Sequence, residues 1–433
     1  MARRLDAQAP DFPAQFDALL NAKRAEEEDV AAAVRGILKE VRTRGDAALV
    51  ELTNRFDKAG VTAATLRLTQ AEIDAAEAQC SQAALDALGV AAQRIEDYHR
   101  RQIPQDAWFT DATGARLGWR WTALDSVGLY VPGGTASYPS SVLMNAVPAR
   151  VAGVGRVVMV TPASGGTINP LVLAAAKRAG VREIYRVGGA QAVAALAYGT
   201  ASIAAADKIV GPGNAYVAAA KREVFGTVGI DSVAGPSEIL VVADGANNPD
   251  WIAADLLSQA EHDASSQSIL ITDDADFAGQ VEAAVERALA LLPRETIARA
   301  SWSDYGAVIV VATLDDAAAL VDAIAPEHLE IATAEPERLL KQVRHAGAIF
   351  LGRYTPEAMG DYIAGPNHVL PTSRTARFSS GLSVLDFLKR TTLLQCEPGT
   401  IAQIGPDAIV LAQAEGLDAH ARSIAARLNA ARG

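Results

Sequence analysis

The regular alternation of short β-branched runs with alanine-rich segments constrains the fold of this chain more than any other feature. Between about residues 125 and 243, the runs SVGLYV, RVVMV, EIYRV, DKIV and EILVV recur roughly every 25–30 positions. Segments typical of helices, such as NPLVLAAAKRAG and QAVAALAYG, lie between them. Strands that alternate with helices in this way predict a parallel sheet with helices on its faces.

A second set of runs with the same rhythm follows: SILIT, AVIVVA, LEIAT and GAIFLG. The 433 residues allow about three domains at roughly 150 residues each. We therefore expect an α/β fold with two parallel-sheet units, the first inserted into the second. Half of the residues are hydrophobic and only 5% are aromatic, so alanine, valine, leucine and isoleucine must build the cores.

The segments outside these units follow other patterns. The first hundred residues are predicted to be helical, with Thr69 and Glu72 in the register of a capping box. Residues 108–124 alternate around a Thr-Gly pair, which predicts a β-hairpin. Beyond about residue 353 comes a long polar loop of the kind that usually has a function. The chain ends in a helical segment that Gly416 should interrupt.

Composition excludes several classes of function. The net charge is −12 and there is no basic stripe, so nucleic acids and anionic membranes are poor partners. The only two cysteines, Cys80 and Cys396, cannot form a disulfide framework or a thiolate zinc site. The start of the chain lacks the apolar stretch of a signal peptide, and no apolar run reaches the ~18 residues of a membrane span. We therefore expect a cytoplasmic protein.

Three glycine-rich turns each follow a predicted strand and precede a predicted helix: YVPGG (130–134), VGGAQ (187–191) and VGPGN (210–214). In a parallel sheet such turns gather at the carboxyl edge, where backbone N–H groups and helix N-termini can hold phosphates. Glycine is also common in tight turns for conformational reasons alone, and none of the three matches G-x-G-x-x-G. The pattern allows either a nucleotide site or three ordinary turns.

Scarce histidines, acids and amides mark a second possible site. A predicted helix capped at Asn248 ends with Gln259 and His262, which are three residues apart and therefore on one face. Further along, polar side chains lie in the long loop and the last helical segment: Asp361, His368, Glu415 and His420. By contrast His99, on a polar helix, is expected to be a solvated surface residue.

Four of these side chains could bind a metal ion, namely Gln259, His262, Asp361 and His420. They would offer one amide oxygen, two imidazoles and one carboxylate, which are donors that suit zinc. Because their spacing matches no local motif, they could equally be polar residues with partners inside the protein.

Glu327 and His328, in the segment APEHLEI, lie between a predicted helix and a predicted strand. An adjacent carboxylate and imidazole can share proton transfer, since histidine titrates near neutrality and glutamate can accept a proton from water. The alternative is two solvated side chains at the flank of a strand. The absence of G-x-S-x-G, H-E-x-x-H and P-loop motifs excludes serine hydrolases, zincins and Walker-type NTPases.

Taken in order along the chain, these fragments resemble the histidinol dehydrogenase family. The motifs SQAEHD, APEHLEI, GDYIAGPNHVLPT and AEGLDAH carry the likeness, as do GLYVPGG, VGGAQAVAALAYGT, DKIVGPGN and VAGPSEIL. The likeness runs over nearly the whole chain. That family oxidises L-histidinol to L-histidine through histidinal, using two NAD⁺ and one bound zinc, as the last step of histidine biosynthesis. The resemblance implies the same oxidoreductase activity here.

The resemblance also implies roles for individual residues. It makes Glu327 and His328 the catalytic proton acceptors. The implied zinc ligands are Gln259, His262, Asp361 and His420. The implied substrate contacts are these four ligands together with His328, Ser237, His368 and Glu415. The implied NAD⁺ contacts, one in or beside each glycine-rich turn, are Tyr130, Gln191 and Asn214.

The family is dimeric and its C-terminal segment is swapped onto the partner subunit, so the resemblance implies a homodimer. His420 and Glu415 would then complete the site of the other subunit. Residues 1–129 with 238–380 form the predicted first domain, which carries the zinc and catalytic residues. Residues 130–237 form the predicted inserted Rossmann-like NAD-binding domain, and residues 381–433 form the C-terminal extension.

Three other functions compete with this interpretation. A family relative that oxidises another small alcohol, such as a sulfonated diol, would share the motifs. Glu415 argues against it, because a carboxylate suits a cationic amine and would repel a sulfonate. A zinc hydrolase would use the same ligands without binding NAD⁺. A non-catalytic scaffold would have no need of Glu327 and His328.

Overall fold

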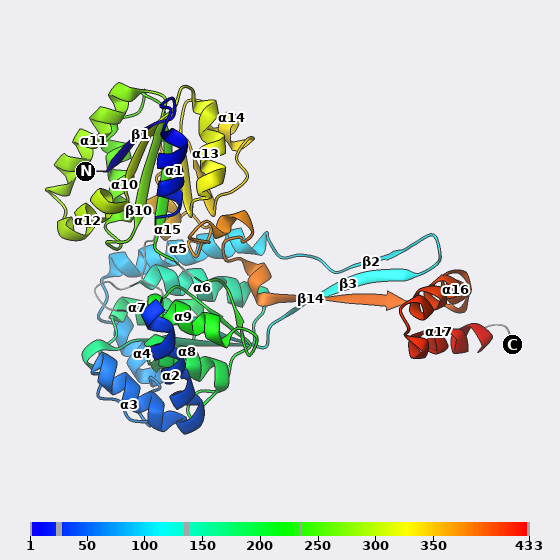
Figure 1. The fold of residues 1–433 in the computed structure, drawn as a ribbon. Coiled ribbons are helices and arrows are strands. Elements are labelled where there is room, and N and C mark those ends of the chain that lie inside the picture. The colour runs from blue at the N-terminus through cyan, green and yellow to red at the C-terminus, as the bar shows by residue number, and fades with distance from the viewer. Residues whose placement is uncertain (1, 23–27, 134–137, 234, 431–433) are drawn as a thin grey trace.

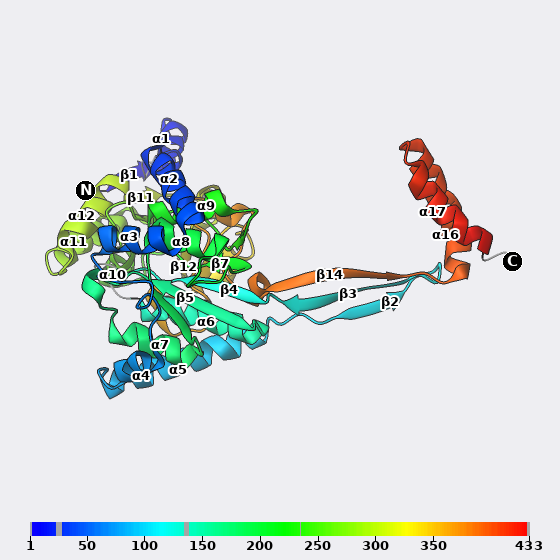
Figure 2. The ribbon, with the colours of Figure 1, turned by 90° about the horizontal axis from the view of Figure 1, so that it is seen from below.

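The computed structural model describes residues 2–22, 28–133, 138–233 and 235–430. Within these residues the strands form three sheets, of six, five and three strands. Helices cover the two larger sheets, and the third sheet is a narrow ribbon that extends away from both (Figures 1 and 2). The predicted α/β class with two parallel-sheet units is confirmed.

The six-stranded sheet pairs entirely in parallel. Its order is β1 (Arg3–Asp6), β11 (Ala307–Val310), β10 (Gln267–Thr272), β9 (Glu238–Ala243), β12 (His328–Ala332) and β13 (Ala348–Leu351). One face is covered by α10 (Pro249–Ala260), α11 (Ala275–Leu289) and α12 (Glu295–Tyr305). The other face is covered by α1 (Phe12–Leu20), α13 (Ala317–Ile324) and α14 (Pro336–Leu340).

The strand β1 corrects the expectation that the first hundred residues are only helical. Its four residues, RRLD, have the pattern of neither a long strand nor a helix, and they form a strand because β11 offers them an unpaired edge. Leu5, the one buried residue of β1, joins the core between the sheet and α13.

The five-stranded sheet is also parallel. Its order is β6 (Glu183–Arg186), β5 (Arg156–Thr161), β4 (Ser126–Tyr130), β7 (Lys208–Val210) and β8 (Gly229–Ile230). One face packs against α4 (Gln70–Glu77), α5 (Gln82–Arg100), α6 (Pro139–Ala152) and α7 (Pro170–Ala179). The other packs against α2 (Glu28–Arg44), α3 (Asp46–Asp57), α8 (Gly189–Tyr198) and α9 (Ala215–Val224).

This packing differs from the predicted division of the chain. The helices of residues 28–100 bury their apolar faces against the five-stranded sheet, whereas the prediction grouped them with residues 238–380. Amphipathic periodicity shows that a helix has a face to bury but does not show which sheet buries it. At the local level the capping box of α4 is confirmed, since Thr69 N–H donates to the Glu72 carboxylate at 2.8 Å and Glu72 N–H donates to Thr69 Oγ1 at 3.3 Å.

The third sheet and the last two helices form a projecting arm. The predicted hairpin is confirmed as β2 (Ala107–Thr110) and β3 (Arg116–Ala123), and β14 (Leu388–Gln395) pairs antiparallel with β3 along its full length. Beyond β14 lie α16 (Pro398–Ala414) and α17 (Asp418–Ala430), which are separated at Gly416, where φ is +71°. Figures 1 and 2 both show these helices at the far end of the ribbon, away from the two larger sheets.

Short elements complete the described chain. The helix α15 (Glu357–Tyr362) lies within the predicted polar loop, and 3₁₀ turns occur at Ser164–Gly166, Leu314–Asp316, Thr375–Arg377 and Val384–Phe387. Both cysteines are free thiols. In the described residues, no helix has both the length and the apolar character that crossing a bilayer requires.

Candidate active site

Two adjacent strands position the catalytic candidates. β9 begins at Glu238 and β12 begins at His328, and the two strands run parallel with His328 opposite Ile239. Glu327 and His328 are only 7% and 4% exposed. The alternative of two solvated side chains at a strand flank is therefore wrong, and the pair is shielded from bulk water.

The main chain of Glu238 contacts both side chains. Its N–H donates to Glu327 Oε2 at 2.9 Å, and its carbonyl oxygen lies 2.9 Å from His328 Nδ1. Because a carbonyl oxygen only accepts, this contact places the proton on Nδ1 and leaves a lone pair on Nε2 of the neutral ring. His328 Nε2 is buried and has no hydrogen-bond partner in the described part of the chain. In the neutral ring, Nε2 is the atom that can accept a proton.

Gln259 and His262 lie at the C-terminal end of α10, as predicted. Asn248 caps the start of this helix by accepting from Asp250 N–H at 2.9 Å. The helical turn continues to His262, whose N–H donates to the Gln259 carbonyl at 3.1 Å. Gln259 is fully buried with Nε2 3.1 Å from His328 Nδ1, whereas His262 is exposed. A largely apolar helix thus ends by placing an amide against His328.

The short helix α15 brings two carboxylates to the same place. Glu357 Oε1 and Asp361 Oδ1 lie 3.7 and 3.8 Å from His328 Nε2. His368 follows in the next loop, with Nδ1 3.8 Å from Asp361 Oδ1 and Nε2 3.3 Å from Ser141 Oγ. The sequence interpretation missed Glu357, although its spacing of four residues from Asp361 places both on one helix face.

Burial and neighbouring charges shift the pKa values of these groups in different directions. Burial raises the pKa of Glu327 to about 8 and, with the charge of Asp361, that of Glu357 to about 7. Burial would lower the pKa of His328, but the carboxylates of Glu327, Asp361 and Glu357 raise it to about 10. Burial would raise the pKa of Asp361, but the neighbouring imidazoles of His328 and His368 lower it to about 2. Asp361 is therefore the carboxylate of the cluster that is ionised at neutral pH.

Three buried atoms of this cluster have no hydrogen-bond partner within the described residues: Gln259 Oε1, His328 Nε2 and Glu357 Oε1. Possible ligand atoms of His328, Glu357 and Asp361 all lie within 4.8 Å of one another. Buried polar atoms without a partner are costly, so their convergence calls for an explanation. Oxygen and nitrogen donors of this kind suit a divalent cation, zinc included. The residues present therefore fit a bound cation.

The structure does not bring His420 or Glu415 to this cluster. Glu415 follows α16, His420 lies on α17, and both are exposed. In Figure 1 these helices lie at the opposite end of the arm from the six-stranded sheet that carries His328. Within one chain, the four predicted metal ligands therefore do not meet. Ser237, another predicted substrate contact, immediately precedes β9 and is half-buried.

The glycine-rich turns join strands to helices of the five-stranded sheet, as predicted. Gly134 of the first turn lies outside the described residues. Tyr130 is buried and its hydroxyl accepts from Gly189 N–H of the second turn at 3.0 Å. Gln191 is also buried, and Asn214 caps α9 by accepting from Val217 N–H at 3.2 Å. The predicted NAD⁺ contacts thus lie at one edge of this sheet, and their role in binding stays a prediction.

His99 corrects another expectation. It is fully buried on α5, with Nδ1 2.7 Å from the Ile95 carbonyl, and burial lowers its pKa. The polar neighbours of His99 in the sequence suggested a solvated face, but the helix turns this one position toward the core.

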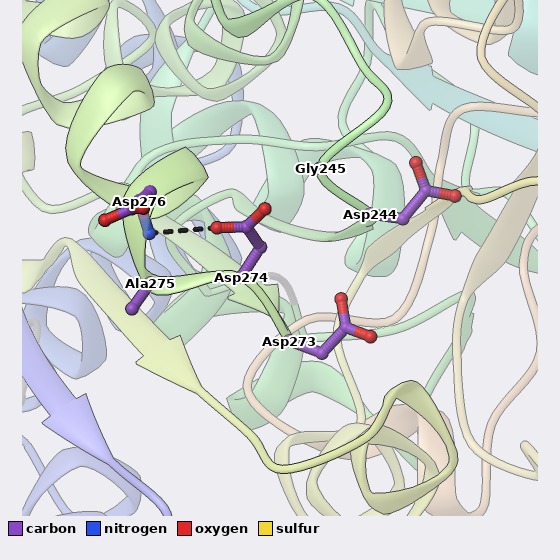
Figure 3. A pocket seen from close by; sticks show the side chains of 6 residues that line it. All are labelled: Asp244, Gly245, Asp273, Asp274, Ala275 and Asp276. Carbon is purple, nitrogen blue, oxygen red and sulfur yellow. Dashed lines mark hydrogen bonds between the residues drawn. The ribbon is translucent and has the colours of Figure 1, made fainter.

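Aspartates line a hollow at the carboxyl edge of the six-stranded sheet (Figure 3). This edge is opposite the one where β12 begins at His328. Two of these aspartates have local partners. Asp274 caps α11 by accepting from Asp276 N–H at 2.9 Å, as Figure 3 shows, and Asp244 pairs with Arg353 at 2.7 Å. This hollow is separate from the cluster around His328, which lies at the amino end of β12.

The fold and the site together define an α/β enzyme in which a buried glutamate–histidine pair lies beside a cluster of donors that fits a cation. A family model described as histidinol dehydrogenase matches residues 20–428. A histidinol dehydrogenase of Rhodospirillum rubrum is 66% identical over 430 residues, with 99% of each chain covered. One from Rhodopseudomonas palustris is 63% identical over 429 residues, covering 99% of this chain and 100% of that one.

Structural comparison agrees with the sequence comparison. The crystal structure of histidinol dehydrogenase from Elizabethkingia anophelis matches with a TM-score of 0.95 and 37% identity, over 100% of this chain and 99% of that one. The chain belongs to the histidinol dehydrogenase family and is an oxidoreductase.

Proposed function

We propose that this protein catalyses the zinc- and NAD⁺-dependent oxidation of L-histidinol to L-histidine through L-histidinal, the last step of histidine biosynthesis, in the cytoplasm. The observation that carries the proposal is the buried Glu327–His328 pair, whose unpartnered Nε2 faces two carboxylates in a member of this family. The overall reaction converts one alcohol, two NAD⁺ and one water into a carboxylate, two NADH and protons.

The proposed metal ligands are Gln259, His262, Asp361 and His420. When bound, zinc would supply a charged template that orients the nitrogen atoms of the substrate. The unpartnered amide oxygen of Gln259 and the ionised carboxylate of Asp361 support this assignment. A cation beside Asp361 would also oppose the charge that raises the pKa of His328, which would favour its neutral, proton-accepting form.

In the first half-reaction, His328 Nε2 accepts the hydroxyl proton of histidinol while hydride leaves the carbinol carbon for NAD⁺. In the second, Glu327 accepts a proton from the water that attacks the aldehyde, and the hydrate gives a second hydride to a fresh NAD⁺. Glu327 and His328 share the Glu238 main chain as a support, so both act on the same carbon. Ser237 and His368 would hold the substrate from neighbouring segments.

The arm supplies the missing groups in this proposal. His420 lies on α17 and Glu415 directly follows α16, and both helices lie at the far end of the arm from the six-stranded sheet of their own chain (Figure 1). A two-fold homodimer that exchanges arms would place them in the partner's site, with both sites completed at once. The carboxylate of Glu415 would then face a cationic substrate.

A product count tests the reaction. The zinc-loaded enzyme should form about two NADH for each histidinol consumed, because a four-electron oxidation needs two hydride acceptors. Glu327→Gln should stop after the first oxidation, with about one NADH and free histidinal, whereas the exposed control Glu335→Gln should still give two. One NADH per histidinol in the unaltered enzyme would overturn the proposal.

Oxidation of a sulfonated diol is the alternative to exclude. The site contains Glu357 and Asp361, and adding Glu415 would make it more negative, so an anionic substrate would be repelled. NAD⁺ reduction with histidinol and with anionic diols, measured side by side, should favour histidinol by orders of magnitude. A preference for the diol would reverse the assignment.

A further inference from the structure

A buried ion pair contacts the backbone of the third glycine-rich turn. The proposed reaction gives this ion pair no role. The side chains of Lys221, on α9, and Asp231, just after β8, are 2% and 5% exposed and are in direct contact. Lys221 Nζ also donates to the Gly211 carbonyl at 3.0 Å, and Gly211 N–H donates to Asp231 Oδ2 at 2.7 Å. The ion pair therefore holds both backbone groups of one glycine.

Gly211 connects this turn to the other two. Its φ is +111°, a conformation that glycine adopts readily and other residues rarely. A Cβ at this position would lie 2.1 Å from the Tyr130 carbonyl oxygen, so the two segments are in close backbone contact. The Tyr130 hydroxyl in turn accepts from Gly189 N–H. Fixing Gly211 therefore fixes the arrangement of the three glycine-rich turns.

Asp231 also stands where the chain leaves the five-stranded sheet for the catalytic strand β9. Its Oδ1 accepts from Ser232 N–H at 2.7 Å. Further along the same connection, Gly235 N–H donates to Thr372 Oγ1 at 2.6 Å, and β9 then begins at Glu238. The main chain of Glu238 supports the catalytic pair, so Asp231 links the turn to the segment that leads there.

Stability alone does not explain a charged pair in this place. Removing two charges from water is costly, and apolar side chains of similar volume often stabilise a protein as well or better. The contacts to Gly211 give the pair a specific task, since an apolar pair could not hold an N–H and a carbonyl in fixed directions.

We infer that Lys221 and Asp231 are positioning residues, which orient the glycine-rich turn at 210–214 for the dinucleotide and set it relative to the catalytic strand. This inference rests on the proposed use of NAD⁺. Both side chains bond to the backbone of Gly211, so their loss should act on cofactor binding through this turn.

The test measures NAD⁺ and histidinol affinity separately, by calorimetry on the zinc-loaded enzyme. Lys221→Met keeps most of the length of the side chain and removes its charge, and it should weaken NAD⁺ binding at least about ten-fold while histidinol affinity stays within about two-fold. Lys208→Met is the matched control. Lys208 pairs with Asp386 at 3.0 Å at the start of β7, the strand whose other end leads into the turn. This control should leave NAD⁺ affinity unchanged.

A lone buried charge can prevent folding, so the double variant Lys221→Met/Asp231→Asn, which leaves no uncompensated charge, is measured as well. It should show the same loss of NAD⁺ affinity in a protein that melts cooperatively. Unchanged NAD⁺ affinity in either folded variant would overturn the inference and leave the proposed function intact. Failure of the unaltered enzyme to bind NAD⁺ would overturn both.

Discussion

Two inactive variants of this chain should restore each other's activity when they share a dimer. His328→Gln removes the proton acceptor from the body of one chain, and His420→Ala removes the proposed zinc ligand from the arm of the other. If arms are exchanged, one site of the mixed dimer receives both defects and the other receives neither. The mixed dimer should therefore form NADH at about half the rate of the unaltered dimer.

The dimensions of the arm support this expectation. β14 has eight residues, which at about 3.3 Å per residue span roughly 26 Å. α16 adds seventeen residues beyond it, before α17 begins. A zinc–nitrogen bond is about 2 Å long, so an arm extended as in Figures 1 and 2 cannot bring His420 to the cluster of its own chain.

The assay uses co-expression of the two chains with different affinity tags, followed by two successive purifications that retain only mixed dimers. Each single-variant homodimer should be slower by at least about 10²-fold, the usual cost of losing a proton acceptor. A mixed dimer of His328→Gln with Asp361→Asn is the control, because both of its sites carry a defect in the body and no arm can repair them. If the His328→Gln/His420→Ala dimer is as inactive as this control dimer, His420 does not act across the interface.

Three further predictions follow from the contacts. Removing zinc with a chelator should abolish NADH formation and returning zinc should restore it, and activity that survives complete metal removal would contradict the assigned ligands. Thr69→Ala should lower the free energy of unfolding by about 1 kcal/mol in urea titrations, because the capping box of α4 is lost, and an unchanged midpoint would refute this. Burial raises the pKa of Tyr130 to about 12, so unfolding releases a phenol that ionises from about pH 10. The stability that this side chain contributes is therefore fully present below about pH 10 and is lost between about pH 10 and pH 12, a total of about 3 kcal/mol. Tyr130→Phe should reduce this pH-dependent loss. Denaturation curves recorded at about pH 9 and pH 11 for both proteins would measure it. A decline of the same size in the variant would contradict the assignment.

Local patterns predicted the elements of this fold well because they report on local chemistry. The β-branched runs became buried strands, the Thr-Gly pair became a hairpin turn, and Asn248 became a helix cap. Assigning helices to sheets required contacts between distant residues, which periodicity does not contain. The helices of residues 28–100 therefore lie on a different sheet from the one expected.

In the site too, the sequence indicates the individual residues but not which of them come together. Glu327, Gln259 and Asp361 gather around His328, a convergence that their spacing in the sequence left open. Glu357 was missed because a glutamate at the start of a short helix has the pattern of an exposed residue, and only packing reveals its burial. His420 belongs to the predicted C-terminal extension, but no sequence pattern states whether such an extension folds back or projects.

The first strand of the six-stranded sheet has a consequence for handling the protein. β1 covers one edge of β11, whose residues AVIV are apolar and strongly β-forming. Without Arg3–Asp6, the unpaired backbone groups of β11 would be exposed on an apolar edge strand. Such an edge can pair with a strand of another molecule. Proteolytic removal of these residues would therefore promote aggregation and shorten the time for which the enzyme stays active, although β1 is separated from β12 by three strands.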